Sequence, residues 1–242
     1  MKKQGDLYLI PNTIGEENVE RSLATHNFSV VASLQHFAVE NQKSARKFIR
    51  KVVPDVVQAD LKLYDLDKNS KAADLAPMIQ LLKNGVSVGI ISEAGMPGIA
   101  DPGALLVAAA HRNSVRVVPL IGASSIFLAL AASGFNGQHF TFHGYLPIDR
   151  HERRKSIQHL YSDSQRKNSA EIFMETPYRN NQLMEELLKT LPNDCLLCVA
   201  CNIAQADEKI LTLPIHIWKK TAYDLHKKPT IFILQATEQF LT

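Results

Sequence analysis

Short apolar runs alternate with helical segments through the first half of this chain, and this alternation constrains the fold more than any other feature. The segments expected to be strands are 6–12, 30–40, 86–91 and 115–120. The segments with helical spacing or helix-boundary residues are 44–53, 71–85, 102–113 and 124–134. Strands that alternate with helices form βαβ units, so the pattern predicts a mostly parallel sheet in this half.

The pattern restarts after residue 134 and becomes more mixed. We expect strands at 139–147, 170–175, 195–203 and 229–236, a helix at 180–192, and a further element at 208–218. The spacing near the end is typical of hairpins. We therefore predict an α/β fold of two α/β domains, residues 1–120 and 121–242, the first with a mostly parallel sheet and the second with a mixed sheet.

The composition is that of an ordinary globular protein. Of the 242 residues, 45% are apolar and 21% are charged. The longest apolar candidate, 124–135, is too short and too polar for a membrane span, and the first apolar run is too short for a signal-peptide core. We expect a cytoplasmic protein that does not engage a membrane. The net charge of +3 is compatible with an anionic partner.

Three cysteines, Cys195, Cys198 and Cys201, have a spacing found in some metal sites. They lie in a strand-like segment, however, where Cys195 and Cys201 share one face and Cys198 points to the other. No fourth cysteine or nearby histidine completes a zinc site. We expect buried structural cysteines and no metal. Three histidines also lack the spacing of metal ligands and are expected to be ordinary strand residues: His36, His139 and His143.

The strand predicted at 86–91 runs directly into the loop SEAGMPGIADPG, residues 92–103, which holds three glycines and two prolines. It is not a P-loop, because it has no lysine to reach phosphates, and it lacks the G-x-G-x-x-G spacing of a dinucleotide-binding loop. Its glycines allow the backbone to approach a ligand closely. We interpret the loop as one whose backbone holds a ligand that needs no phosphate charge. The alternative is a structural turn in which Asp101 caps the next helix.

Two other predicted strands end in comparable loops. The strand at 115–120 runs into Gly122 and a helix that opens with Ser124 and Ser125, and the first strand ends in PNTIG. Two hydroxyl groups at a helix start most often cap the helix. In an open parallel sheet, however, ligands gather at the carboxyl ends of the strands. Three such loops favour a ligand site at that edge.

These stretches resemble the tetrapyrrole-methylase superfamily of S-adenosyl-L-methionine (SAM) methyltransferases, and within it the branch that 2′-O-methylates a cytidine of small-subunit ribosomal RNA. SEAGMPGIADPG is similar to the SDAGTP-x-I-x-DPG-like loop of that branch, and VPLIGASS to its VPLPGPSA-like loop. FTFHGYLP and FMETPYR are similar to its F-x-F-x-GFLP and FYESPHR-like segments. The matches are collinear over about residues 7–235. The resemblance implies two α/β domains with SAM in a cleft between them, usually in a homodimer.

Carried over by position, the resemblance implies a set of SAM contacts. In the first half they are Thr13, Ala94, Gly95, Met96, Ile99, Ser124 and Ser125. In the second half they are Glu175, Ile203 and Thr230. The implied substrate is ribosomal RNA or the small ribosomal subunit. The interpretation of the loop agrees with SAM, which carries a sulfonium cation and no phosphate.

The sequence departs from the motifs of this family at several positions. Thr13 replaces the proline of TPIGNL, and the AEDTR motif reads AVENQ, with Glu40 kept and Lys43 in place of the arginine. The ARELTK motif reads ACNIAQ, without charge at Cys201 and Asn202, and the closing KGE reads KKP. We expect these positions to bear on the substrate and the chemistry.

A ribose 2′-hydroxyl is a poor nucleophile, so a base or a cation that stabilises the alkoxide would assist methyl transfer. The candidates are Glu40, Lys43, Glu93 and Glu175. The alternative interpretation of each is a solvated side chain on the protein surface. Basic side chains expected to contact RNA phosphates are Arg150, Arg153, Arg154 and Lys155, together with the segment 46–51. The alternative interpretation of such a run of charges is a solvated helix face.

Two further functions stay open: a methyltransferase of the same fold acting on a tetrapyrrole or another small molecule, and a SAM-binding or RNA-binding protein without catalysis.

Overall fold

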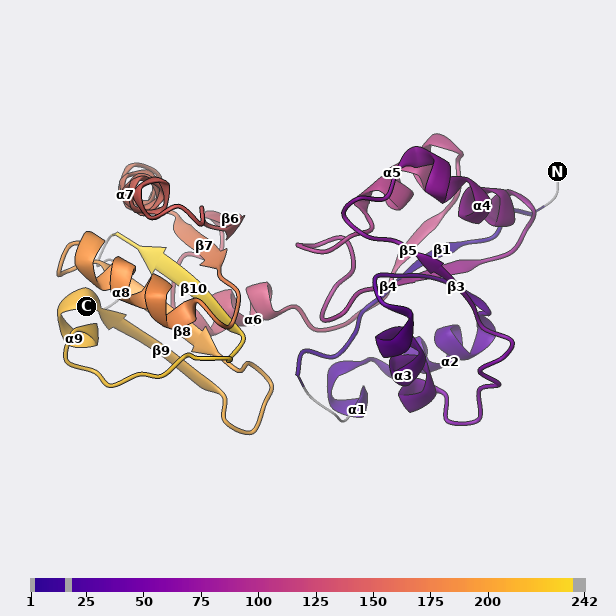
Figure 1. Ribbon diagram of the computed structural model, residues 1–242, viewed down its shortest axis with the longest axis horizontal. Helices are drawn as coiled ribbons and strands as arrows, with labels where there is room; N and C mark the ends of the chain where they lie inside the picture. Colours follow the sequence, from indigo (N-terminus) through magenta and orange to yellow (C-terminus); the bar gives the residue numbers. More distant parts are fainter. Residues whose placement is uncertain (1–2, 16–18, 237–242) are drawn as a thin grey trace. The chain divides into compact units, whose positions relative to one another are not determined.

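A parallel sheet of five strands, in the order β3-β2-β4-β1-β5, forms the centre of the N-terminal part of the protein (Figure 1). The computed structural model describes residues 3–15 and 19–236, and the chain divides into two units, Met1–Ser124 and Ser125–Thr242. The strands of the first unit are β1 Leu7–Ile10, β2 His36–Val39, β3 Lys62–Asp65, β4 Val88–Ile91 and β5 Val117–Pro119. All their pairings are parallel, as predicted.

Helices cover both faces of this sheet (Figure 1). They are α1 Val19–Ser22, α2 Thr25–Ser33, α3 Gln42–Val52, α4 Ala72–Lys83 and α5 Ala104–Arg112. Successive side chains of a strand point to opposite faces. Ile10 and Phe37 therefore pack against α2 and α3, while Leu7 and Val88 pack against α4 and α5. The two hydrophobic cores hold the sheet between them and leave the carboxyl ends of its strands to the loops.

The prediction of a strand over residues 30–40 is wrong in its first half. Val30 to Ser33 complete α2, and only His36–Val39 form a strand. The β-branched pair Val30 and Val31 suggested a strand, but these residues follow buried Asn27 at helical spacing and pack with Phe37 in one core. Tertiary packing of that face outweighs the strand propensity of valine.

The C-terminal unit has a mixed sheet in the order β6-β7-β10-β8-β9, in which only β6 and β7 pair in parallel. Its strands are β6 Phe140–Tyr145, β7 Ala170–Met174, β8 Leu196–Cys201, β9 Lys209–Pro214 and β10 Thr230–Gln235. Its helices are α6 Ser125–Ser133, α7 Arg150–Lys167, α8 Asn180–Thr190 and α9 Ile215–Trp218. The predicted mixed sheet is confirmed, and the predicted element at 208–218 is a strand followed by one helical turn.

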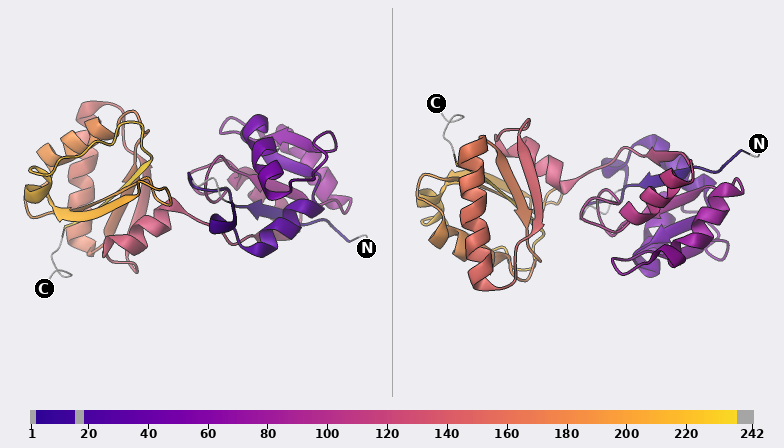
Figure 2. Two further views of the ribbon diagram at one scale, coloured as in Figure 1. Left: turned by 90° about the horizontal axis from the view of Figure 1, so that it is seen from below. Right: turned by 90° about the horizontal axis from the view of Figure 1, so that it is seen from above.

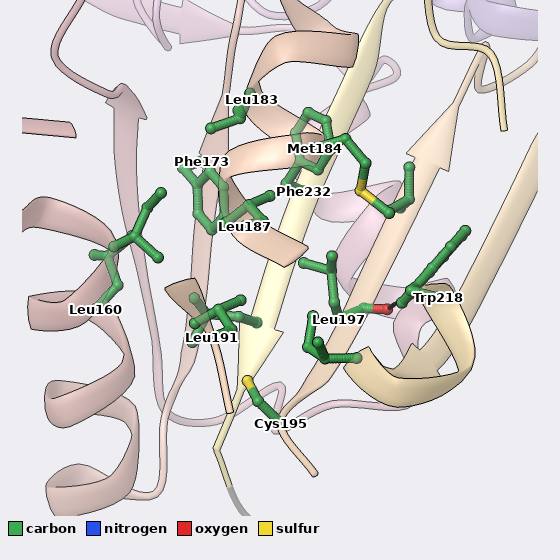
Figure 3. Packing of buried hydrophobic residues seen from close by; sticks show 14 of the residues in the cluster. Leu160, Phe173, Leu183, Met184, Leu187, Leu191, Cys195, Leu197, Trp218 and Phe232 are labelled. Carbon is green, nitrogen blue, oxygen red and sulfur yellow. Dashed lines mark hydrogen bonds between the residues drawn. The ribbon is translucent and has the colours of Figure 1, made fainter. Parts of the chain in front are cut away.

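The main core of this unit lies between the sheet and the helices α7, α8 and α9 (Figures 2 and 3). The rings of Phe173 and Phe232 stack on neighbouring strands with their centroids 5.8 Å apart. The indole Nε1 of buried Trp218 donates a hydrogen bond of 2.8 Å to the carbonyl oxygen of Leu197. Among the described residues, no helix is long and apolar enough to cross a membrane.

The three cysteines are buried, unbridged and divided between the two faces of the sheet. Cys195 and Cys201 belong to the core that includes residues of α8 and α9, and Cys198 does not. Figure 3 shows Cys195 in this core. Burial raises the pKa of Cys195 to about 12 and that of Cys198 to about 11. The predicted alternation of faces and the predicted burial are confirmed, and thiols on opposite faces of a strand cannot converge on one ion.

Candidate active site

Three loops leave the carboxyl ends of adjacent parallel strands in the N-terminal unit. Because β1 lies between β4 and β5, the loops at 11–15, 92–103 and 120–124 follow neighbouring strands. Isolated bridges tie Asn12 to Gly95 and Leu23 to Gly122. The structure thus brings together the three loops that the sequence analysis singled out.

Asn12 joins the first two of these loops. Its backbone N–H donates to the carbonyl oxygen of Gly95 over 2.8 Å. Its side-chain amide donates to the carbonyl oxygens of Ser92 and Glu93, at 2.9 and 3.1 Å, and its Oδ1 accepts from the Thr13 N–H at 2.8 Å. Asn12 was not among the site residues predicted from the sequence. One feature of the sequence could have indicated Asn12. Its amide side chain directly follows Pro11 at the end of a buried strand, where it can form hydrogen bonds with neighbouring backbone groups.

Two glycines let the loops approach one another. A Cβ on Gly122 would lie 2.2 Å from Cγ of Pro11, so no larger residue fits there without movement of the first loop. Gly95 has a φ of +66°, and a Cβ there would meet the carbonyl oxygen of Ala123 at 3.5 Å. The loops therefore present closely spaced backbone groups at the strand ends.

The predicted cofactor contacts in this unit occupy the rim of the loops. Ala94 and Ile99 are exposed, and Gly95 is buried by the neighbouring loops. Partly buried positions are Thr13, Met96 and Ser124, and Ser125, the first residue of α6, is also partly buried. The alternative in which Asp101 caps the following helix is wrong, because the N-cap of α5 is Gly103.

A group of carboxylates lies at the same edge of the sheet. Glu40 follows β2, Glu93 follows β4 and accepts a hydrogen bond from the Ser44 hydroxyl, and Asp101 lies further along the same loop. Partial burial, then the charges of Glu93 and Asp67, raise the pKa of Glu40. Burial, then the charges of Glu40 and Glu93, raise the pKa of Asp101 from 3.8 to about 6, while a hydrogen bond with Ser92 lowers it. With no lysine or arginine in 92–103, this edge suits a cation.

Asp101→Asn is expected to stabilise the protein at pH 8 and to leave its stability unchanged near pH 3.5. The folded state binds the Asp101 proton more tightly than the unfolded state does, so stability falls as pH rises from about 4 to about 6. Asparagine cannot ionise and lacks this penalty. Thermal unfolding followed by circular dichroism across this pH range measures the difference. A difference in melting temperature that is constant from pH 3.5 to 8 would contradict the assignment.

Three other predicted cofactor contacts of the C-terminal unit meet at one edge of the mixed sheet. Glu175 directly follows β7, Ile203 lies just after β8, and Thr230 begins β10, which runs between those strands. Thr230 is opposite Cys201, and the Asn202 N–H donates to the carbonyl oxygen of Pro229 at 2.9 Å. All three predicted residues are buried.

The carboxylate of Glu175 forms hydrogen bonds within the turn that follows β7. Its Oε1 accepts from the backbone N–H of Thr176 and from Nη2 of Arg179, both at 2.6 Å, and so closes the turn after β7. Asn202 has a different arrangement. Its side-chain Nδ2 donates to Asp207 at 2.8 Å, while its buried Oδ1 has no partner among the described residues. That oxygen can accept a hydrogen bond from a ligand at this edge.

The basic cluster on α7 divides into two kinds of side chain. Arg150 and Arg154 are exposed and each places its Nε 3.2 Å from a carboxylate oxygen of buried Glu186. Arg153 is only 2% exposed and donates to the carbonyl oxygen of Ile148 at 3.1 Å. The prediction that Arg153 meets phosphate is therefore wrong for this structure, because its side chain points to the interior, about 100° around the helix from that of exposed Arg154. Lys155 is exposed and pairs with Glu152.

Two of the three histidines lie in strands, as predicted. His36 belongs to β2 and bonds to the Tyr64 hydroxyl at 2.9 Å. His143 belongs to β6 and its Nε2 lies 2.5 Å from Oε2 of buried Glu171. His139 directly precedes β6, outside the strand. Among the described residues, no three histidine, cysteine or carboxylate side chains gather where they could hold a metal ion.

A cavity of about 190 Å³ lies within the C-terminal unit, beneath the segment 222–228. Its lining includes the apolar side chains of Met184, Val199 and Trp218, and also four charged residues: Asp207, Lys209, Asp224 and Lys228. None of the predicted cofactor contacts lines it.

Comparison with known proteins places these features in a family. Residues 27–216 match the family model described as Tetrapyrrole (Corrin/Porphyrin) Methylases. The chain belongs to the tetrapyrrole methylase family. Its members use SAM, so SAM is the cofactor that the family membership assigns. The suspected family, the α/β fold and the cofactor are thus confirmed.

Three relatives of this chain carry the same name. The chain is similar to the ribosomal RNA small subunit methyltransferase I of Vibrio cholerae, with 29% identity over 86% of this chain and 68% of that protein. The protein of that name from Streptococcus pyogenes serotype M6 is 32% identical over 77% of this chain and 61% of its own length. The protein from Bacillus subtilis is 29% identical over 77% and 60%. This chain thus spans about 60–68% of these three relatives.

Solved structures confirm the fold of this tetrapyrrole methylase. Diphthine synthase matches with a TM-score of 0.67 and 13% identity, covering 95% of this chain and 89% of that chain. The methyltransferase CobJ matches with a TM-score of 0.63 and 15% identity, covering 96% and 94%. At these identities the likeness concerns the fold.

The residues present fit SAM as the bound cofactor. The strand-end loops offer closely packed backbone groups at Gly95 and Gly122, and the second loop carries the carboxylates of Glu93 and Asp101 and no lysine or arginine. At the edge of the C-terminal sheet, the unpartnered Oδ1 of Asn202 is a buried acceptor of the kind that a bound ligand satisfies. When bound, SAM supplies an electrophilic methyl group on a sulfonium cation.

Proposed function

We propose that this protein transfers the SAM methyl group to the ribose 2′-oxygen of a cytidine in small-subunit ribosomal RNA. The observation that carries the proposal is the meeting of three strand-end loops that lack phosphate-binding side chains and lie beside the carboxylates of Glu40, Glu93 and Asp101. The names of the curated relatives support ribosomal RNA as the class of substrate. The sequence motifs described above support the cytidine 2′-oxygen as the acceptor.

The proposal assigns SAM to residues of both units. In the N-terminal unit, the contacts are Thr13, Ala94, Gly95, Met96, Ile99 and Ser124, and Ser125 adjoins them as the first residue of the C-terminal unit. In the C-terminal unit, they are Glu175, Ile203 and Thr230, which meet at one sheet edge. Methyl transfer is an in-line displacement, so the contribution of these residues is to hold the methyl group in line with the acceptor oxygen.

For the proton of the 2′-hydroxyl, Glu40 is the favoured acceptor. Its raised pKa improves the match between a carboxylate base and neutral pH. Lys43 lies in the first turn of α3, three residues further on, and would stabilise the developing alkoxide. Glu175, held by Arg179, acts instead as a positioning residue for the turn after β7.

For the RNA, exposed Arg150 and Arg154 are the proposed phosphate contacts. Glu186 fixes one nitrogen of each guanidinium and leaves the others available. We retain the homodimer as a proposal, which analytical ultracentrifugation tests.

Ser124→Trp is expected to lower SAM affinity by about tenfold or more, the equivalent of about 1.4 kcal/mol. The indole would occupy space that the proposal assigns to the cofactor, on a residue that is only partly buried and so tolerates substitution. Isothermal titration calorimetry with SAM measures the loss. The control is Ile121→Trp, since Ile121 lies in the same loop and is 79% exposed. Equal affinities in both variants and the native protein would contradict this placement of SAM.

Methyl transfer itself is tested with labelled SAM and small ribosomal subunits from a strain that lacks this protein. The proposal predicts label in the RNA. Label in a small-molecule fraction of a cell extract, with none in RNA, would favour a tetrapyrrole or another small acceptor. SAM binding without transfer to either would favour a non-catalytic protein, consistent with the changes at Cys201 and Asn202.

A further inference from the structure

An exposed aromatic side chain stands beside the sheet edge to which we assigned part of the cofactor site. Tyr178 is 71% exposed and lies in the turn after β7, three residues beyond Glu175. Its ring makes an edge-to-face contact with exposed His226, with centroids 6.2 Å apart and planes inclined at 75°. His226 precedes Thr230 by four residues. Two rings are thus presented to solvent from turns that also carry proposed cofactor contacts.

Hydrogen bonds lock these two turns together. The Lys227 N–H donates to the carbonyl oxygen of Pro177 at 2.9 Å. Fully buried Asn180 donates from Nδ2 to the carbonyl oxygen of Lys228 at 2.6 Å. Asn181 extends the connection, since its Oδ1 accepts from the Leu225 N–H at 2.8 Å. The turns are therefore ordered before any ligand arrives, and little conformational freedom remains to be lost on binding.

The charge around the two rings favours an anionic partner. Lys227 is exposed and Lys228 is half-buried, both within two residues of His226. The one nearby carboxylate on the same turn, Asp224, accepts hydrogen bonds from Asn181 and from the His226 N–H. Those bonds lower the pKa of Asp224 and reduce its demand for a further partner. Basic side chains beside an exposed aromatic ring are the arrangement that single-stranded nucleic acids require.

We propose that Tyr178 is a stacking platform for a base of single-stranded RNA next to the methyl acceptor, with Lys227 on the adjoining phosphate. The inference rests on the proposed function, which makes RNA the substrate. A base splayed from a loop can stack on an exposed ring, and such stacking tolerates different bases because each has a flat face. Tyr178 thereby holds the RNA strand, while the acceptor nucleotide itself is positioned by the cofactor site.

The test compares Tyr178→Ala, Tyr178→Phe and the native protein for binding of a single-stranded RNA oligonucleotide that contains 2-aminopurine. Stacking quenches the fluorescence of this base. We expect quenching with the native protein and with Tyr178→Phe. Tyr178→Ala should lose the quenching and bind about 5- to 100-fold more weakly, the range for loss of one base stack. Its affinity for inorganic polyphosphate, which has charge and no bases, should stay unchanged.

Controls separate this inference from the proposed function. SAM affinity should be the same in all three proteins, because the Tyr178 ring points to solvent. If the native protein methylates small subunits and Tyr178→Ala binds RNA with unchanged affinity and quenching, the stacking role is refuted while the proposed function stands. If Tyr178→Ala instead dissociates a dimer in sedimentation analysis, the ring belongs to an interface between copies and the inference is overturned. If the native protein neither binds nor methylates RNA, the proposed function is wrong, and the stacking role that rests on it is refuted as well.

Discussion

Phe232→Ala will destabilise the C-terminal unit by about 3–5 kcal/mol, the range for truncation of a buried aromatic side chain. Phe232 is fully buried on the central strand β10, and its ring stacks on that of Phe173. The core between the sheet and its three helices cannot collapse readily onto the space left, because strands pair with β10 on both sides. A loss of this size removes a large part of the stability of a typical domain.

Trp218 provides the measurement. It is the single tryptophan of the chain, is 3% exposed, and belongs to the same core as Phe232. Its fluorescence during urea unfolding therefore reports on this unit. The control is Phe140→Ala on the edge strand β6, where the side chain is 37% exposed, for which we expect about 1 kcal/mol or less. Similar shifts in the two variants would contradict the assignment of Phe232 to the centre of the core.

Asn12→Ala will destabilise the N-terminal unit by about 2–4 kcal/mol, because it leaves buried and partly buried backbone groups without a partner. The carbonyl oxygens of Ser92 and Glu93 lose a donor, and the Thr13 N–H loses its acceptor. Since these groups belong to the loops that we assign to SAM, affinity for the cofactor should fall as well. Far-ultraviolet circular dichroism during urea unfolding gives the stability, and calorimetry gives the SAM affinity.

Asn41→Ala is the matched control for Asn12. Asn41 also binds backbone through its side chain, accepting from the N–H groups of Lys43 and Ser44, but it caps α3 at an exposed position. We expect a loss of about 1 kcal/mol there, typical of a helix cap. A loss for Asn12→Ala no larger than that for Asn41→Ala would show that the link between the two loops is not structurally important.

The arrangement of strands and loops follows largely from local patterns. Apolar runs that end in glycine and proline predicted β1, β4 and β5, and the parallel order of the sheet then brings their loops together. Residues 30–33 were misassigned because valine pairs occur in strands and in buried helix faces, and only the packing around Phe37 separates the two.

Side-chain environments were less predictable than backbone elements. Arg153 and Arg154 are adjacent and chemically identical, yet the first is buried and the second is half exposed, because neighbours on a helix point about 100° apart. Asn12 was missed because its partners lie some 80 residues away and are backbone atoms, which no sequence motif marks.

The altered motif residues are part of an ordered edge. Cys201 replaces a charged residue and packs in the core of the C-terminal unit. Asn202 has a φ of +50°, a conformation that asparagine tolerates better than most residues, and its amide bonds to Asp207. These changes thus keep the edge intact while removing charge from it, and the chemistry of this protein has to proceed without that charge.

Alkaline hydrolysis distinguishes the proposed methyl transfer from SAM to a ribose 2′-oxygen of small-subunit ribosomal RNA from methylation of a base. RNA labelled by the purified protein and methyl-labelled SAM is digested with alkali, which cleaves only next to a free 2′-hydroxyl. If the protein methylates the cytidine 2′-oxygen, the label appears in an alkali-stable dinucleotide whose 5′ nucleoside is 2′-O-methylcytidine. Label released in mononucleotides would place the methyl group on a base and contradict methylation of the 2′-oxygen.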